Sequence, residues 1–161
     1  MKRNTLILLG ILGSVVLVIA LYVGGFIWIV PKMHDETLTK FSNQIFSVQL
    51  PADTTQVDSI SVIGQQFANG NHCDYLAARL LETSLQKEKL ENDFEENYQG
   101  TSKLQFIWLD ESNAYTDDIF DSSKIYSLDD WLDQHAQTSK ADVVVYLFEG
   151  HMTSSFDYRC R

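Results

Sequence analysis

The sequence predicts an α+β protein with an N-terminal transmembrane helix, followed by a small domain with a mainly antiparallel sheet and about two helices. A long uncharged, apolar run at the N-terminus indicates the membrane helix. After it, about six short segments carry strand patterns with short turns between them, which favours antiparallel pairing. Two further segments begin with helix-start signals, so we expect helices packed on that sheet.

The membrane segment is the apolar run from Leu6 to Val30, which contains twenty-five uncharged residues. As a helix it would reach roughly 37 Å, and a bilayer core of about 30 Å needs about 20 residues. The rival interpretation is a cleavable signal peptide, whose apolar core has roughly 7–15 residues. The run continues from Leu21 to Val30 beyond the small-residue site at Ala20, so we expect the helix to be retained in the lipid bilayer.

Positive charge predicts the orientation, because Lys2 and Arg3 precede the run and basic ends stay in the cytoplasm. The protein is then a single-pass protein of the cell membrane, with its N-terminus cytoplasmic and its C-terminal domain extracytoplasmic. The expected order is a cytoplasmic tail (1–5), a transmembrane helix (6–30), a juxtamembrane tether or helical stalk (31–43) and an extracytoplasmic α+β domain (44–161).

Small residues recur four apart in the membrane segment, as Gly10 with Ser14 and Ala20 with Gly24. This spacing allows two helices to approach closely. The alternative is that glycine and serine are simply common in such helices.

The first half of the domain is expected to form strands, a tight turn and a helix. Segment 73–82 could also be a helix, but the turn before it and the N-cap Ser84 after it favour a strand. In order, we expect strands at Gln44–Leu50 and Val57–Phe67, a turn at Asn69–Asn71, a strand at 73–82 and a helix at 85–97.

The second half is expected to repeat this mixture. The run Val143–Leu147 is apolar on both faces, which is typical of a buried central strand. In order, we expect a strand at Lys103–Leu109, an acidic connection, a short helix from Ser127 to about Ala136, a strand at Ala141–Phe148, a turn at Glu149–Gly150 and a final strand at Met152–Cys160.

The two cysteines, Cys73 and Cys160, both lie in the outer domain, where an even count favours a disulfide. A reactive thiol or a metal ligand is the alternative. His72 and Asp74 flank the first cysteine and Arg159 flanks the second, so a cross-strand Asp74–Arg159 or Asp74–Arg161 ion pair is expected. The same residues, His72, Asp74 and Arg159, are the candidate ligand site.

The charge of the outer part restricts its partners. Residues 31–161 contain ten basic and twenty-two acidic residues, a balance of −12. Such a surface repels phosphate backbones, so we expect no nucleic-acid partner. It favours a basic protein or cations, although solubility alone would also explain the charge.

Specific chemistry is weakly signalled. The acidic connection offers Asp110, Asp117, Asp118 and Asp121 as a possible cation loop, but Tyr115 stands where a calcium loop needs glycine. The four histidines show no helical metal-site spacing and no cysteine pair accompanies them, so no metal or cofactor is expected. Local catalytic motifs are absent, which predicts a non-enzymatic protein.

The stretch Asn69-Gly70-Asn71-His72-Cys73-Asp74-Tyr75, with Tyr158-Arg159-Cys160 near the end, resembles a pattern in small uncharacterised bacterial membrane-anchored envelope proteins. The resemblance covers about ten residues of the chain. It implies a bacterial envelope setting and paired cysteines, and it implies no catalytic residue.

We therefore expect a membrane-tethered protein-interaction module that binds another envelope protein, which could be basic. One alternative is a sensor domain for a small ligand or a cation. A second alternative is an immunity-type protein that neutralises a basic toxin.

Overall fold

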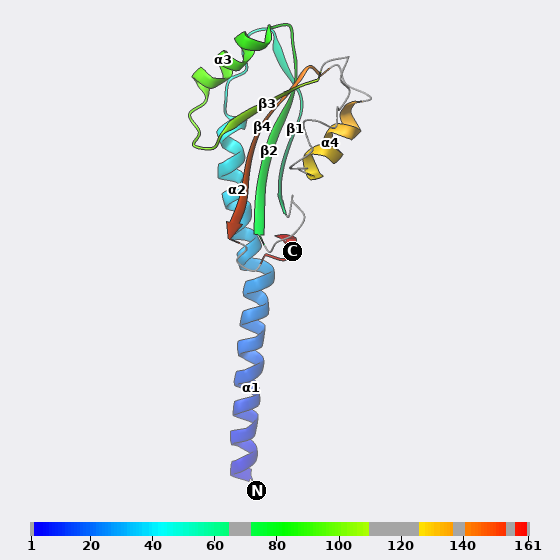
Figure 1. Ribbon diagram of the computed structural model, residues 1–161. Coiled ribbons are helices and arrows are strands. Elements are labelled where there is room, and N and C mark those ends of the chain that lie inside the picture. The colour runs from blue at the N-terminus through cyan, green and yellow to red at the C-terminus, as the bar shows by residue number, and fades with distance from the viewer. Residues whose placement is uncertain (1, 65–71, 110–125, 137–140, 154–156, 161) are drawn as a thin grey trace.

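The computed structural model describes residues 2–64, 72–109, 126–136, 141–153 and 157–160. Its elements follow one another in a simple order, shown in Figure 1. They are α1 (Lys2–Gly24), a π-helical turn η1 (Gly25–Ile29), α2 (Val30–Phe46), β1 (Thr54–Gly64), β2 (His72–Thr83), α3 (Lys87–Asn97), β3 (Leu104–Trp108), α4 (Tyr126–Ala136), β4 (Val143–Thr153) and the 3₁₀ turn η2 (Tyr158–Cys160).

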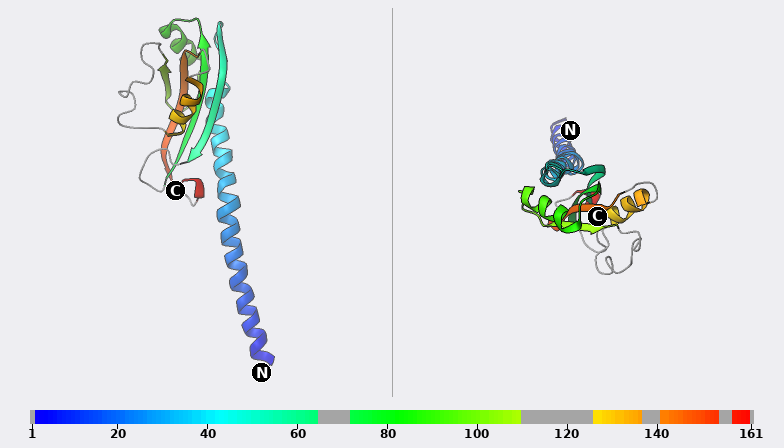
Figure 2. Two further views of the ribbon diagram at one scale, coloured as in Figure 1. Left: turned by 90° about the vertical axis from the view of Figure 1, so that its right-hand side faces the viewer. Right: turned by 90° about the horizontal axis from the view of Figure 1, so that it is seen from above.

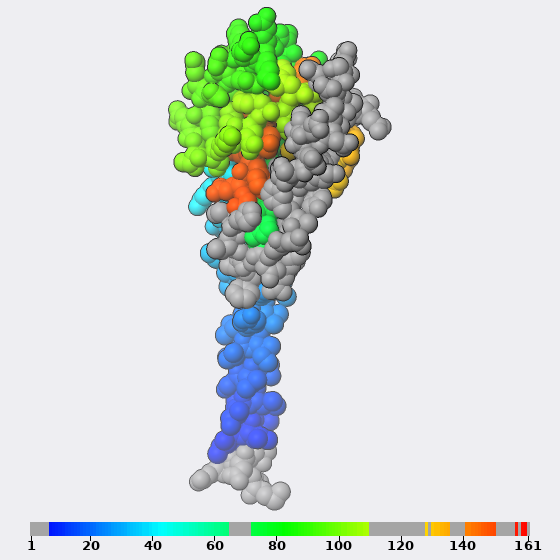
Figure 3. All heavy atoms as spheres, viewed as in Figure 1, coloured from blue at the N-terminus to red at the C-terminus, as the bar shows by residue number. Residues whose placement is uncertain are grey.

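The first three elements form one unbroken helical rod that runs into the domain (Figure 1). Its N-terminal part projects below the domain, as Figure 3 shows, and most of its large apolar side chains between Ile7 and Ile29 are exposed. The rod is the one helix in the described part of the chain that is long and apolar enough to cross a membrane. The π-helical turn ends two residues before Pro31, whose nitrogen cannot donate a helical hydrogen bond.

The predicted strand at Gln44–Leu50 is wrong, because α2 continues through Phe46. Leu38, Phe41 and Ile45 are three and four residues apart and therefore lie on one helix face, which packs into the core. The alternation at residues 45–50 is the end of this helical pattern followed by a turn and a short irregular segment. Residues 31–43, expected as a tether or a stalk, belong to α2.

The described residues of the domain form a four-stranded sheet in the order β1-β2-β4-β3, with every pair antiparallel. The preference for a strand at 73–82 is confirmed by β2, and the helices expected at 85–97 and from Ser127 to about Ala136 correspond to α3 and α4. The α+β class is therefore confirmed.

The predicted turn at Glu149–Gly150 is wrong, because β4 runs through it to Thr153. The pairing shifts there from Tyr75↔Glu149 to Cys73↔Met152, so the strand carries a bulge instead of reversing. A side chain at Gly150 would meet the Phe148 ring at 3.0 Å and Asp74 Oδ1 at 3.3 Å. The final strand at Met152–Cys160 is also wrong, because β4 ends at Thr153 and residues 158–160 form a 3₁₀ turn.

Helices cover both faces of the sheet, as Figure 2 shows from two directions. Residues of β2 alternate between the two layers. Tyr75, Ala77 and Leu81 join the core beneath α2 and α3, whereas Leu76, Ala78 and Leu80 join the core beneath α4. Strand β2 is buried on both faces as a result, because it is a central strand between two helical layers.

A buried arginine fastens the upper end of α2 to the sheet. The Arg79 side chain, on β2, donates from one terminal nitrogen to the carbonyl oxygens of Ile45 (3.2 Å) and Val48 (2.8 Å), and its Nε donates to Gln56 Oε1 (2.7 Å). The carbonyls at a helix C-terminus carry partial negative charge and lack helical partners, so they suit a cation. Burial lowers the pKa of the Arg79 guanidinium.

Candidate functional site at the helix–domain junction

Polar residues from three separate elements meet where the apolar rod enters the domain. We call this group the junction cluster and define it as His34, Asp35, Cys73, Asp157, Arg159 and Cys160. The first two residues lie on the first turns of α2, Cys73 lies at the start of β2, and the last three belong to the C-terminal segment. The cluster therefore joins both ends of the domain's chain to one short stretch of sheet.

The predicted disulfide is present between Cys73 and Cys160. Both cysteines are fully buried, and the bridge closes a loop of sequence separation 87. It ties the start of β2 to the η2 turn, not to a neighbouring strand. Burial keeps reductants away from the sulfur atoms, so the bridge is structural in character.

The carboxylate of Asp157 is the centre of the cluster and is fully buried. It accepts hydrogen bonds from Arg159 Nε (3.0 Å), a terminal nitrogen of Arg159 (2.7 Å) and the Arg159 backbone N–H (3.0 Å). His34 Nδ1 lies 2.9 Å from it, and since a carboxylate only accepts, this nitrogen carries the proton. Burial alone would raise the pKa of Asp157, but the bonds from Arg159 and His34 outweigh it and lower the pKa to about 2.

The guanidinium of Arg159 connects this carboxylate to the rod. It forms an ion pair with Asp35 Oδ1 at 2.6 Å and donates to the carbonyl oxygen of Pro31 at 2.9 Å. The hydrogen bond to Asp157 is the main reason that the pKa of Arg159 is raised. The C-terminal segment thus holds the first turn of α2, directly after the apolar run.

The predicted Asp74–Arg159 pair is wrong within the described residues, because the ion pairs of Arg159 go to Asp157 and Asp35. Asp74 is fully buried, and its carboxylate lies 3.2 Å from His72 Nε2. The bulge in β4 places Gly150 against the same carboxylate. The alternative partner, Arg161, lies outside the described residues.

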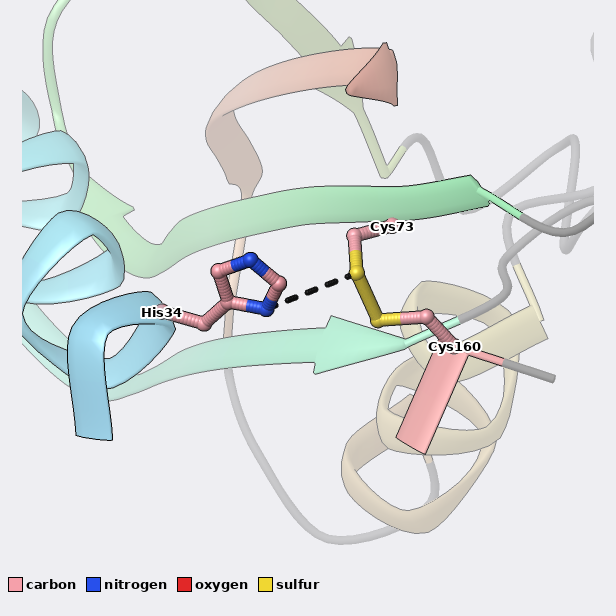
Figure 4. A group of neighbouring side chains, drawn as sticks. All are labelled: His34, Cys73 and Cys160. Carbon is pink, nitrogen blue, oxygen red and sulfur yellow. Dashed lines mark hydrogen bonds between the residues drawn. A yellow bond between two sulfur atoms is a disulfide. The ribbon is translucent and has the colours of Figure 1, made fainter. Parts of the chain in front are cut away.

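Figure 4 shows His34 directed at the disulfide, with Nδ1 3.6 Å from Cys73 Sγ. The donor atoms of His34, Cys73 and Cys160 lie within 4.8 Å of one another, a spacing that could suit a metal ion. Cysteine binds metals as the thiolate, however, and both sulfur atoms are used by the disulfide. In the oxidised protein, the disulfide and the neighbouring ion pairs therefore hold these chain segments together.

Other predicted site residues lie apart from the junction cluster. Gly10, Ser14, Ala20 and Gly24 lie on α1, where a side chain added at either glycine would meet open space. That helix surface is accessible, and its association with another helix stays a prediction. The possible cation loop of Asp110, Asp117, Asp118 and Asp121 falls outside the described residues.

Sequence reasoning missed a second polar group, which joins α4 to β1. Asp58 Oδ2 accepts a hydrogen bond from Trp131 Nε1 at 2.8 Å and lies 2.9 Å from His135 Nε2. The hydrogen bond from Trp131 is the main cause of the lowered pKa of Asp58. Residues Trp131 and His135 are four apart on a helix, so they share a face, but their partner Asp58 lies 73 positions before Trp131 in the chain.

The missed residues of the junction cluster were equally hard to find. The pair His34–Asp157 spans 123 positions, and the contact from Arg159 to Pro31 spans 128. The one local signal was the grouping of Asp157 and Arg159 beside Cys160. Comparison with family models, curated proteins and solved structures found no match to this chain.

Proposed function

We propose that this chain is a membrane-tethered protein-interaction module of the cell envelope, with a cytoplasmic N-terminus, an extracytoplasmic domain and no catalytic role. The observation that carries the proposal is the single helix that passes from the apolar segment into the domain core without a flexible linker. Such a helix would give the domain a set height and orientation above the bilayer.

Both ends of α2 are held, which supports this interpretation. Arg159 binds the carbonyl of Pro31 at the first turn, and Arg79 binds the carbonyl of Ile45 in the last turn and that of Val48 just after the helix. Between them, Phe41 and Ile45 are buried in the core. A flexible tether would be sufficient for a domain that only captures a soluble ligand, whereas a fixed mount suits a surface presented to another membrane-bound component.

The proposed orientation rests on charge and redox chemistry. Lys2 and Arg3 favour a cytoplasmic N-terminus, and a disulfide persists in an oxidising compartment outside the cytoplasm. The acidic balance of the outer part favours a partner with basic residues and disfavours nucleic acid. The partners proposed are therefore the lipid bilayer and an envelope protein with a basic surface.

Fractionation and topology mapping test the first half of the proposal. The full chain should stay with membranes after carbonate washing, and alkaline phosphatase fused after residue 161 should be active. A soluble mature protein, or an inactive fusion in a stable product, would refute the membrane-tethered extracytoplasmic module.

Photo-crosslinking in intact cells tests the second half. Benzoylphenylalanine is placed one at a time at exposed positions, for example Ser61 on β1 and Asn92 on α3. We expect at least one position to form a single defined adduct with one envelope protein. If no position forms an adduct, but a small molecule or a cation raises the melting temperature by several degrees, the sensor alternative would replace the interaction module.

A further inference from the structure

Strand β1 forms one edge of the sheet among the described residues. It pairs with β2 from Thr54 to Gly64, and no other described strand hydrogen-bonds to it. The side chains of Thr55, Gln56, Val57 and Ser61 are exposed. An edge of this kind presents unpaired N–H and C=O groups, which are a template for another strand.

This edge lacks most of the features that normally prevent such pairing. Natural edge strands are blocked by lysine, proline, inward charges or bulges. From Ser59 to Gly64 the strand has no charged residue and no proline, and its one irregularity lies earlier, between Gln56 and Asp58. The single charge of the strand, Asp58, is already engaged by Trp131 and His135 of α4.

The direction of β1 relative to the rod selects the kind of segment that could bind. Gly64 pairs with Asp74, next to the junction cluster, whereas Thr54 pairs with Thr83 at the far end of the domain. The strands run along the axis of the rod, as both Figure 1 and Figure 2 show. Strand β1 therefore runs toward the apolar helix, and an antiparallel partner would run away from it.

The last residue of β1, Gly64, also lies close to the expected membrane surface. The cluster residue His34 is four positions after Val30, which corresponds to about 6 Å along a helix. A strand of about ten residues that starts near Gly64 would reach the whole length of β1. This is the path of a chain that leaves the membrane with its N-terminus in the cytoplasm.

We propose that the outer edge of β1 binds, as an antiparallel fifth strand, the extended juxtamembrane segment of a second envelope protein with the same membrane orientation. This inference rests on the proposed function and names its surface and its partner class. Backbone hydrogen bonds would supply the affinity, and side chains on alternate positions would supply specificity.

Charge indicates the composition of that segment. The far end of β1 is flanked by Asp53, which directly precedes the strand, and by Glu82, which is opposite Thr55. Both residues are exposed. A segment that runs away from the membrane would bring its C-terminal part to these carboxylates, so lysine or arginine is expected there.

A second copy of this chain fits the edge less well. Two copies in one membrane are related by an axis along the membrane normal, so their rods must point the same way. Because β1 runs along the rod, two such edges could meet only as parallel strands. Extension of a wholly antiparallel sheet favours an antiparallel strand instead.

The test uses the full chain in lipid nanodiscs and a synthetic probe peptide of about ten residues. The peptide alternates threonine and valine and ends in two lysines; its controls end in two glutamates or carry a central proline. Amide hydrogen exchange is measured across β1. We expect the lysine peptide to slow exchange at β1 by about tenfold or more, and both control peptides to have little effect.

Matched variants locate the effect. Ser61→Lys adds an edge lysine at an exposed position, and Asn92→Lys adds the same charge at an exposed position of α3. Circular dichroism and intact disulfides confirm folding of both. We expect Ser61→Lys to weaken peptide binding by about tenfold and Asn92→Lys to leave it unchanged.

Several outcomes would overturn the inference: no protection of β1 by the lysine peptide, equal loss in both variants, or β1 protection that appears without peptide and rises with protein concentration. The last outcome would indicate a second copy as the occupant. A photo-crosslinker at the N-terminus of the peptide should react near Gly64; reaction near Thr54 would mean parallel pairing and would also overturn it. If envelope-protein adducts form from Asn92 but not from β1, the interaction module stands and this surface does not.

Discussion

The junction cluster and the outer edge of β1 differ in whether their polar groups are paired within the chain. At the junction, Asp157 and Arg159 are bound by other groups of the same chain, and the Asp157 carboxylate is fully buried. At the edge, β1 has a described strand partner on one side, and an edge strand's other donors and acceptors can bind water. Buried polar groups must be paired within the chain and so fix its geometry, whereas exposed groups leave a surface free to bind something else.

Removal of the disulfide should produce the largest effect at the junction. In the double variant Cys73→Ser/Cys160→Ser, the unfolded chain regains the freedom of a loop of sequence separation 87. We expect the free energy of unfolding to fall by about 2–5 kcal/mol, measured by chemical denaturation in detergent. Unchanged stability would mean that the ionic contacts alone hold the C-terminal segment, and the junction would then differ less from the edge.

Removal of the guanidinium at the other end of α2 should have the next largest effect. Arg79→Met retains the apolar stem but leaves the carbonyls of Ile45 and Val48 without this donor. We expect a loss of about 2–3 kcal/mol, because buried carbonyls would lose a charged partner. Arg79→Lys serves as the control and should restore part of the stability; no difference between the two variants would contradict a capping role.

Acid should weaken the junction through Asp157. The pKa of this carboxyl is about 2 in the folded protein, below its ordinary value of 3.8. Its contribution is therefore complete above about pH 4 and is lost as the pH falls from about 4 toward 2. The shift corresponds to about 2 kcal/mol, and urea unfolding as a function of pH measures it.

The matched control for that titration is Asp157→Asn, which should be less stable at neutral pH and should show a flatter pH profile in this range. An identical profile in both proteins would show that other carboxyl groups cause the acid dependence.

The contact between α4 and β1 should have the smallest effect, because Asp58 is 40% exposed and solvent screens its interactions. Trp131→Phe removes the hydrogen bond that chiefly lowers the pKa of Asp58. We expect that pKa to rise toward its ordinary value in NMR titrations. Because Trp131 is also buried in the core, the loss from the Asp58–Trp131 hydrogen bond itself, about 0.5 kcal/mol, is measured in a double-mutant cycle with Asp58→Asn. A loss of stability as large as that expected at the junction would mean that α4 also holds the edge strand rigidly.

Elements defined by neighbouring residues could be predicted. The strand at β2 was favoured by the turn signal before it, the strand core of β4 follows from its apolar run, and α3 follows from its helical spacing. The predicted cap of α3 is wrong, because the helix begins at Lys87 with Gln86, not Ser84, at its N-cap. The strand predicted at Gln44–Leu50 failed because a helix end and a strand look alike over seven residues. The turn predicted at Glu149–Gly150 failed because glycine serves both turns and bulges, and here a bulge makes room for Asp74.

The sequence by itself determined the long apolar helix, the α+β class and the pairing of two cysteines, because length, periodicity and an even cysteine count are properties that can be read locally. The tertiary structure decided which partners the charged residues have. Arg159 binds Asp157, Asp35 and Pro31 instead of Asp74, and Arg79 caps a helix from the sheet. Such contacts join residues far apart in the chain, and their energies depend on burial and distance, which exist only after folding.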